Sequence, residues 1–298
     1  MAEASAFSRP SPQKLAMSAV LLIDCPDAKG IVAEVSQFLY RHDANIIHAD
    51  QHQDALRDLF FMRVEWELAD FDVGPEEFAA KFQPLAARFD MRWSVDYFTR
   101  APRMAVFVSK YDHCLVDLLY RHHVGELRCD IPLIIGNHAH AQKWADFYEI
   151  PFFHIPTPQG QKEAFEREQL RLLAEHEIDL VVLARYMQIL SDDFVSHFPR
   201  RAINVHHSFL PAFAGARPYH RAYERGVKLI GATSHYVTAE LDEGPIIEQD
   251  VARVSHRDAL EDLLHKGRDL EKLVLSRAVG WHIQRRVLLY GDKTVIFD

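Results

Sequence analysis

The chain is poor in cysteine and carries no excess of positive charge. Its 298 residues include only Cys25, Cys114 and Cys129, which lie far apart and show no Cys-x-x-Cys spacing. This pattern indicates neither a disulfide framework nor a zinc site. The formal net charge of −9 argues against a general nucleic-acid binder, because such a protein would need a basic face.

Long apolar runs are also absent. No apolar run approaches the roughly 18 residues that a membrane-spanning helix needs. Residues 1–16 contain Ser, Pro, Gln and Lys without a continuous apolar stretch, so we expect a disordered tail rather than a secretory signal. We therefore expect a cytoplasmic protein with neither a membrane nor a nucleic-acid partner.

Residues 17–98 show a strand and helix pattern of their own. An apolar strand at 19–24 ends at Pro26 and Gly30, and apolar residues then recur at helical spacing. Two strands, a second helix beginning near Pro75 and a last strand follow. The order β-α-β-β-α-β predicts a ferredoxin-like domain.

The pattern changes after a linker that we place at residues 99–103. Over residues 104–298 strands alternate with helices, and the segment Leu180 to Ala184 is almost continuously apolar. Such a pattern predicts an α/β domain with a Rossmann-like, mostly parallel sheet flanked by helices. Ligands bind such sheets outside the carboxyl ends of the strands, where we expect Ala184, Asn204 and His235 to lie.

The segment Ala202 to Pro211 contains the most informative polar residues. If Ile203 to His206 ends a strand, Asn204 and His206 share one face of it. An amide donor and a titratable ring could then converge on one developing oxyanion, or could simply be satisfied by backbone at the strand end. A polar loop after His235 offers a carboxylate to orient the ring or to act as a base; its acidic residues are Glu240, Asp242 and Glu243.

Together these two segments resemble the folate-dependent formyltransferase family. The Asn-x-His pair and the distant Asp of that family match Asn204, His206 and Asp242. The resemblance implies that a loop after residue 184 holds a pterin ring and that residues 237–242 form the opposite wall, although the first loop could also merely cap the core. The implied substrate-binding residues are Met187, Gln188, Ile189, Leu190, Val237, Glu240 and Lys110.

Within the family, the chain looks like the deformylase branch. The loop Ser109 to Cys114 lacks the glycine-rich phosphate cradle of a ribonucleotide enzyme, and the acidic composition disfavours tRNA. The turn before Gly30 also resembles the opening of an ACT domain. That likeness implies an amino-acid effector site at Asp27, Gly30 and Ile31, or alternatively a module that only forms a homo-oligomer.

The implied reaction is hydrolysis of 10-formyltetrahydrofolate to formate and tetrahydrofolate, which would supply formate for purine synthesis. Asn204 and His206 would stabilise the oxyanion, Asp242 would hold the water, and His235 would support them. Transfer to a small amine, or a folate- and amino-acid-sensing regulator without catalysis, are the alternatives. We expect no metal, because the adjacent His206 and His207 face opposite ways, and no permanently bound cofactor. Phe153 stands where the family commonly has a histidine. We expect Lys110 and His113 to line the side where an amine acceptor would otherwise enter, and His207 to pack or form a hydrogen bond elsewhere.

Overall fold

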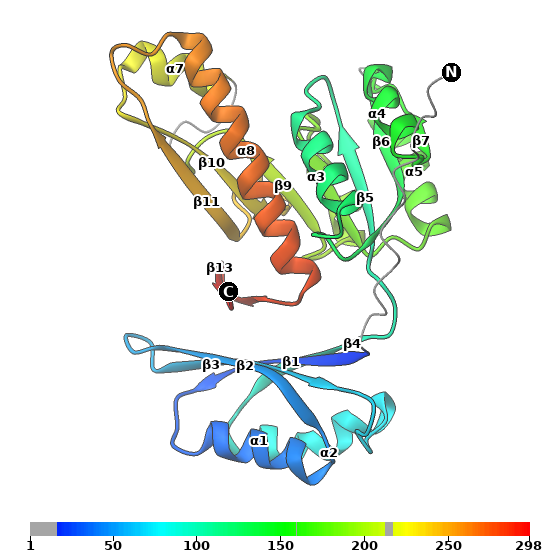
Figure 1. The fold of residues 1–298 in the computed structure, drawn as a ribbon, viewed down its shortest axis with the longest axis vertical. Helices are drawn as coiled ribbons and strands as arrows, with labels where there is room; N and C mark the ends of the chain where they lie inside the picture. The colour runs from blue at the N-terminus through cyan, green and yellow to red at the C-terminus, as the bar shows by residue number, and fades with distance from the viewer. Residues whose placement is uncertain (1–16, 159, 212–216) are drawn as a thin grey trace, which may run out of the picture. The chain divides into compact units, whose positions relative to one another are not determined.

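In a computed structural model of the chain, residues 17–158, 160–211 and 217–298 are described, and they form two compact units (Figure 1). One unit contains residues 17–101 together with Gln284–Asp298. The other is Pro102–Ile283. The tail expected at residues 1–16 lies outside the described residues. No helix in the described part of the chain is long and apolar enough to cross a membrane.

The N-terminal unit has the predicted β-α-β-β-α-β order, with a hairpin added from the end of the chain. Its elements are β1 (Ser18–Pro26), α1 (Ile31–Arg41), β2 (Asn45–Asp54), β3 (Leu59–Glu67), α2 (Pro75–Arg88), β4 (Arg92–Phe98), β12 (Val287–Tyr290) and β13 (Lys293–Ile296). The four-stranded sheet is antiparallel, in the order β2-β3-β1-β4. Leu21 and Ile23 of β1 point into a core beneath the two helices.

The hairpin β12–β13 covers the other face of this sheet, which corrects the predicted extent of the second domain. Leu288 and Phe297 pack against Val20, Leu22 and Phe61 in a separate apolar cluster. Residues 284–298 therefore belong with the N-terminal unit and not with residues 104–283. The physical reason is that β1 is apolar on both faces, so its second face must also be buried.

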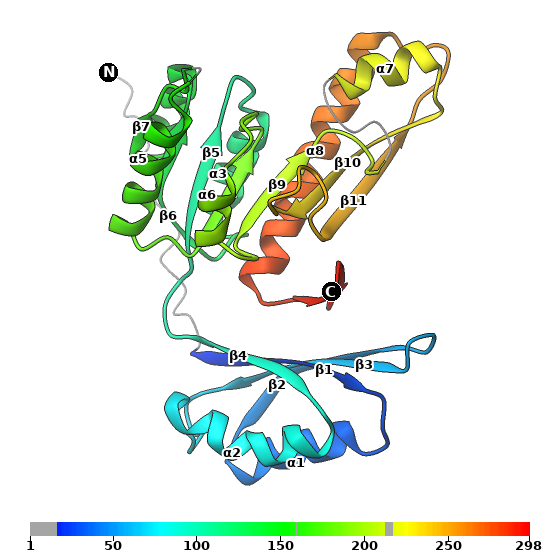
Figure 2. The same ribbon diagram turned by 180° about the vertical axis from the view of Figure 1, so that it is seen from behind.

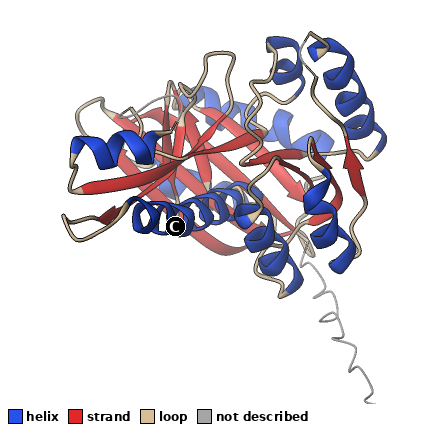
Figure 3. Ribbon diagram, turned by 90° about the horizontal axis from the view of Figure 1, so that it is seen from above, coloured by secondary structure: helices blue, strands red, loops and turns tan. Residues whose placement is uncertain are grey.

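The second unit is a seven-stranded sheet covered by helices on both faces (Figures 1 to 3). Its strands are β5 (Arg103–Val108), β6 (Asp130–Gly136), β7 (Phe152–His154), β8 (Leu180–Ala184), β9 (Ala202–His206), β10 (Leu229–Tyr236) and β11 (Ile246–Arg253). Its helices are α3 (His113–His123), the short η1 (Ala139–Ala141), α4 (Gln142–Phe147), α5 (Lys162–Glu175), α6 (Asp192–His197), α7 (Pro218–Arg225) and α8 (Leu260–Ile283).

The strand order β11-β10-β9-β8-β5-β6-β7 confirms the mostly parallel sheet. Strands β5 to β9 run parallel to one another, whereas β10 is antiparallel to both β9 and β11. His235 therefore does not reach the site at a shared carboxyl edge, as the sequence suggested. It reaches the site because it stands directly opposite Asn204 in the β9–β10 register.

Candidate active site

Asn204 and His235 form a hydrogen-bonded pair across β9 and β10. The Asn204 Nδ2 atom lies 3.2 Å from His235 Nε2, and His235 Nδ1 lies 2.9 Å from the carbonyl oxygen of Tyr236. Because that carbonyl can only accept, the proton of a neutral His235 ring is assigned to Nδ1, and Nε2 accepts from the Asn204 amide. The pair thus fixes the orientation of the amide.

His206 and Asp242 form the second pair of the site. The Nδ1 atom of His206 lies 3.1 Å from Asp242 Oδ2, and His235 Nε2 lies 3.7 Å from Oδ1 of the same carboxylate. Asp242 sits in the loop between β10 and β11 with a left-handed backbone, at φ 60°. His206 Nε2 is buried and has no hydrogen-bond partner among the described residues. The three residues of the predicted catalytic set thus lie side by side.

Burial and charge set the protonation of two of these groups. Burial lowers the pKa of His235, outweighing its backbone hydrogen bond and the nearby Asp242 charge, so the ring is neutral near pH 7. Burial would raise the pKa of Asp242, but the hydrogen bond from His206 and the neighbouring histidines hold it below its usual range. Asp242 is therefore an anion at neutral pH.

The loop after β8 exposes apolar side chains. Met187 is 55% exposed and Ile189 is 62% exposed, whereas Leu190 is buried in the core. Gln188 donates to the carbonyl oxygen of Met187. Large exposed apolar groups on a loop are typical of a ligand-binding surface. The expected role of this loop as a pterin site stays a prediction.

The remaining expected substrate residues lie in separate places. Val237 packs against the core below the loop after β8. Lys110 and Glu240 are exposed, and no described contact joins either of them to the set formed by Asn204, His206 and Asp242. Phe153, whose role the sequence left open, is partly buried against the same core, so it acts in packing.

A buried ion-pair cluster lies at the carboxyl ends of β5 and β8. Glu271 Oε2 lies 2.8 Å from His113 Nε2 and 3.2 Å from Arg185 Nε, while Tyr219 donates to Oε1 at 2.9 Å. We refer to Arg185, Glu271, His113 and Tyr219 as the acidic-helix cluster, because Glu271 belongs to α8. Burial would raise the pKa of Glu271, but the hydrogen bond from His113 and the Arg185 charge outweigh burial and hold this pKa below its usual range. Glu271 is thus an anion held by three partners.

His207 connects the two groups of residues. Its ring centroid lies 5.2 Å from that of His206 and 6.2 Å from that of Tyr219. Burial, aided by the Arg185 charge, lowers the pKa of His207 to about 3, so this ring stays neutral. His207 therefore lies in contact with both clusters and adds no charge of its own.

The acidic-helix cluster could also be considered as a metal site. Ligand atoms of His113, Cys114 and Glu271 lie within 4.8 Å of one another. Both Glu271 oxygens already accept hydrogen bonds, and the Arg185 cation occupies the same surroundings. Burial also raises the pKa of Cys114, which disfavours the thiolate that binds metals. The donor set fits an ion-pair network better than a metal centre.

The expected effector loop lies at the start of α1. Gly30 has φ 95°, a left-handed conformation that favours glycine. Asp27 accepts from Gln53 Nε2, so its carboxylate is already engaged. The side chain of Ile31 is buried in the core, which leaves only its backbone to meet a ligand. An amino-acid ligand at this turn stays a prediction.

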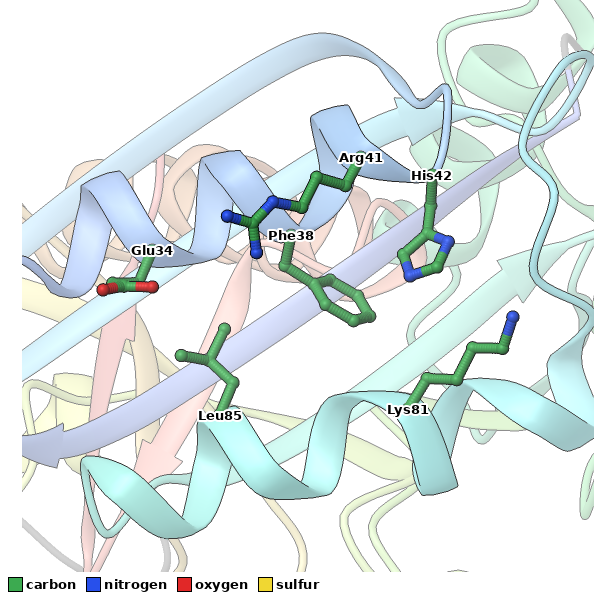
Figure 4. Close-up of a pocket in the computed structure, with 6 residues that line it drawn as sticks. All are labelled: Glu34, Phe38, Arg41, His42, Lys81 and Leu85. Atoms are coloured by element: carbon green, nitrogen blue, oxygen red, sulfur yellow. The ribbon is translucent and has the colours of Figure 1, made fainter.

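A groove of about 430 Å³ runs between α1 and α2 of the N-terminal unit (Figure 4). Phe38 and Leu85 form apolar walls, and Arg41, His42 and Lys81 add polar ends. His42 is hydrogen-bonded to Asp72, and Lys81 lies near Glu77, so both of these side chains already face acidic residues. None of the residues expected to bind an effector lines this groove.

The sequence missed Arg185, Tyr219 and Glu271. The sequence does indicate that Glu271 is unusual, because this charged residue lies on the apolar side of α8 among Leu270, Val274 and Leu275. A charged residue on the buried face of a helix needs partners, but the helical pattern alone cannot identify them. Arg185 and Tyr219 come from distant segments, so only the fold brings them together.

Comparison with known proteins agrees with this arrangement. A formyl transferase model matches residues 102–279, and an ACT domain model matches residues 19–67. A formyltetrahydrofolate deformylase from Synechocystis is 55% identical over 281 residues, covering 94% of this chain and 99% of that protein.

Two solved structures have a fold similar to that of this chain. A formyltetrahydrofolate deformylase from Pseudomonas syringae superimposes with a TM-score of 0.89 at 47% identity, covering 96% of both chains. A glycinamide ribonucleotide transformylase from Symbiobacterium toebii is 29% identical with a TM-score of 0.64, and covers 68% of this chain and 97% of its own. The chain therefore belongs to the formyltetrahydrofolate deformylases, within the formyl transferase family.

Proposed function

We propose that Asn204, His206 and Asp242 hydrolyse 10-formyltetrahydrofolate to formate and tetrahydrofolate. The observation that carries this proposal is the environment of His206. One ring nitrogen faces the Asp242 carboxylate at 3.1 Å, while the other is buried without a partner in the described part of the chain. A buried polar atom of this kind is costly unless it serves a ligand. Membership of the deformylases supplies the substrate.

The geometry divides the chemistry between the two pairs of residues. The oxygen of water attacks the formyl carbon, and the carbonyl oxygen gains negative charge. Asn204 donates its free amide hydrogen to this oxygen, and His206 donates from Nε2. The Asp242 carboxylate faces His206 Nδ1 at 3.1 Å, which holds the ring in the orientation that turns Nε2 toward the formyl oxygen.

Asp242 also holds the attacking water through its second oxygen. This oxygen, Oδ1, lies 3.7 Å from His235 Nε2, which is longer than a hydrogen bond and leaves it able to accept from water. Collapse of the tetrahedral intermediate breaks the bond between the formyl carbon and N10. The proton that the attacking water gives up passes to N10, so that formate and tetrahydrofolate leave in equal amounts.

The test is an assay that follows formate and tetrahydrofolate together, with no amine present. Asn204→Ala, His206→Ala and Asp242→Ala should each lower kcat by roughly a hundredfold or more, since losing one oxyanion donor costs about that in other enzymes. Glu243→Ala is the matched control, because it removes an exposed carboxylate one residue from Asp242. It should keep native turnover.

Two other outcomes of this assay would contradict the proposed hydrolysis. Release of tetrahydrofolate only after an amine is added would make the chain a transferase. Folate binding without release under any condition would make it a regulator. Formate supply to purine synthesis and a homo-oligomeric state stay predictions.

A further inference from the structure

The carboxyl ends of β5 and β8 mark the point where the strand order of the second unit reverses. From β5 the chain proceeds outward through β6 and β7, then crosses back to place β8 on the other side of β5. In open α/β sheets ligands bind in the crevice at such a switch point. A second substrate would therefore be expected between the segments that follow β5 and β8.

In this chain the acidic-helix cluster lies at that point of the sheet. His113 begins the helix after β5, and Arg185 directly follows β8. Glu271 and Tyr219 reach the same place from α8 and α7, and all three residues Glu271, Arg185 and Tyr219 are less than a tenth exposed. The guanidinium of Arg185 also lies 5.4 Å from the ring centre of Tyr111, in the loop after β5.

The surrounding backbone is shaped to keep these side chains in place. Arg185 has φ 63°, a conformation that costs free energy for a residue with a side chain, and its guanidinium lies 3.2 Å from the Glu271 carboxylate. Gly267 lies against Tyr219, where an added Cβ would come 2.3 Å from the ring. The cluster is therefore a specifically packed feature of the fold.

We propose that the acidic-helix cluster occupies the acceptor side of the active site and thereby restricts the formyl acceptor to water. This inference rests on the function proposed above. His207 joins the cluster to His206, so the cluster directly adjoins the site. The ribonucleotide transformylase that shares this fold has, by its name, an organic acceptor, for which such a crevice would have to be open.

Opening the crevice should admit an amine as a competing nucleophile. The amine nitrogen would form a bond to the formyl carbon, the bond to N10 would break, and a proton would pass from the amine to N10. The products are a formylated amine and tetrahydrofolate, with no redox change. The oxyanion donors serve this reaction as they serve hydrolysis, because both pass through a tetrahedral intermediate.

The experiment compares the wild type with Arg185→Ala/Glu271→Ala, which removes the ion pair without leaving one charge buried alone. Both proteins receive 10-formyltetrahydrofolate with excess glycinamide, a small primary amine. The measured quantity is the ratio of N-formylglycinamide to formate. We expect this ratio to lie at the detection limit for the wild type and at least about tenfold above that limit for the variant, since single pocket contacts commonly change acceptor discrimination by that amount.

Asp269→Ala/Lys272→Ala is the matched control, because it removes an exposed ion pair from the same helix. It should give formate alone. If the Arg185→Ala/Glu271→Ala protein does not fold, His113→Ala opens the crevice from the opposite side and the same ratio decides. A folded, active variant that forms no more N-formylglycinamide than the wild type overturns the inference. A wild type that releases tetrahydrofolate only with glycinamide present, and forms N-formylglycinamide in place of formate, overturns the proposed function itself.

Discussion

At the scale of single residues, His235 shows how a neutral ring can position a neighbouring amide. Its Nδ1 donates to the Tyr236 carbonyl, which leaves Nε2 to accept from Asn204. Without this acceptor, the Asn204 amide could rotate away from the oxyanion. His235 thus acts through Asn204 and is a positioning residue.

His235→Phe keeps a ring in the site but removes the acceptor. We expect kcat to fall about fivefold with KM nearly unchanged, because one neutral hydrogen bond is worth about 1 kcal/mol. The decisive measurement is a double-mutant cycle with Asn204→Ala. If His235 acts only through Asn204, adding His235→Phe to Asn204→Ala should cost little more activity. Additive losses would show that His235 acts independently.

The sequence revealed some of these residues and concealed others for identifiable reasons. Asn204 and His206 were visible because alternation along a strand places them on one face. Asp242 stood out among three acids only through the family resemblance. Arg185 and Glu271 remained hidden, because the partner of a buried charge depends on tertiary packing.

At the scale of secondary-structure elements, the sequence predicted where strands and helices lie better than how they associate. The apolar run at β1 and the helical periodicity of α1 gave the N-terminal order correctly. No local pattern shows that β10 is antiparallel to β9, or that β12–β13 covers a sheet more than 180 residues earlier in the chain. Both depend on which buried surfaces fit together.

The hairpin offers a prediction at this scale. Phe297 is 1% exposed and packs against Val20 and Phe61. Phe297→Ala should destabilise the N-terminal unit by about 3–5 kcal/mol, through lost burial and a residual cavity. Faster hydrogen exchange in β1 and β3 would report this loss. Phe147→Ala, at a residue 74% exposed, is the control and should leave that exchange unchanged. Unaltered exchange in the Phe297 variant would contradict the structural role of the hairpin.

At the scale of the whole molecule, buried histidines couple folding stability to pH. His207 has a folded-state pKa of about 3, against 6.5 for the ordinary side chain, because burial and the Arg185 cation oppose its charge. Glu271 and Asp242 act in the opposite direction but do not outweigh them. Between these two pKa values the unfolded chain binds a proton that the folded chain does not. Stability contributed by the neutral ring is therefore present above pH 6.5 and is lost as pH falls towards 3.

Melting curves at pH 7 and pH 5 test this coupling. A pH of 5 lies about 1.5 units below the ordinary histidine pKa. Protonation of this side chain therefore stabilises the unfolded state by roughly 2 kcal/mol relative to pH 7. His207→Asn removes the titrating group, so its stability should fall less between the two pH values than that of the wild type. His140→Asn, at an exposed histidine, should follow the wild type. Equal losses in all three proteins would show that His207 becomes protonated in the folded state at pH 5, and that the Arg185 cation does not keep this ring neutral.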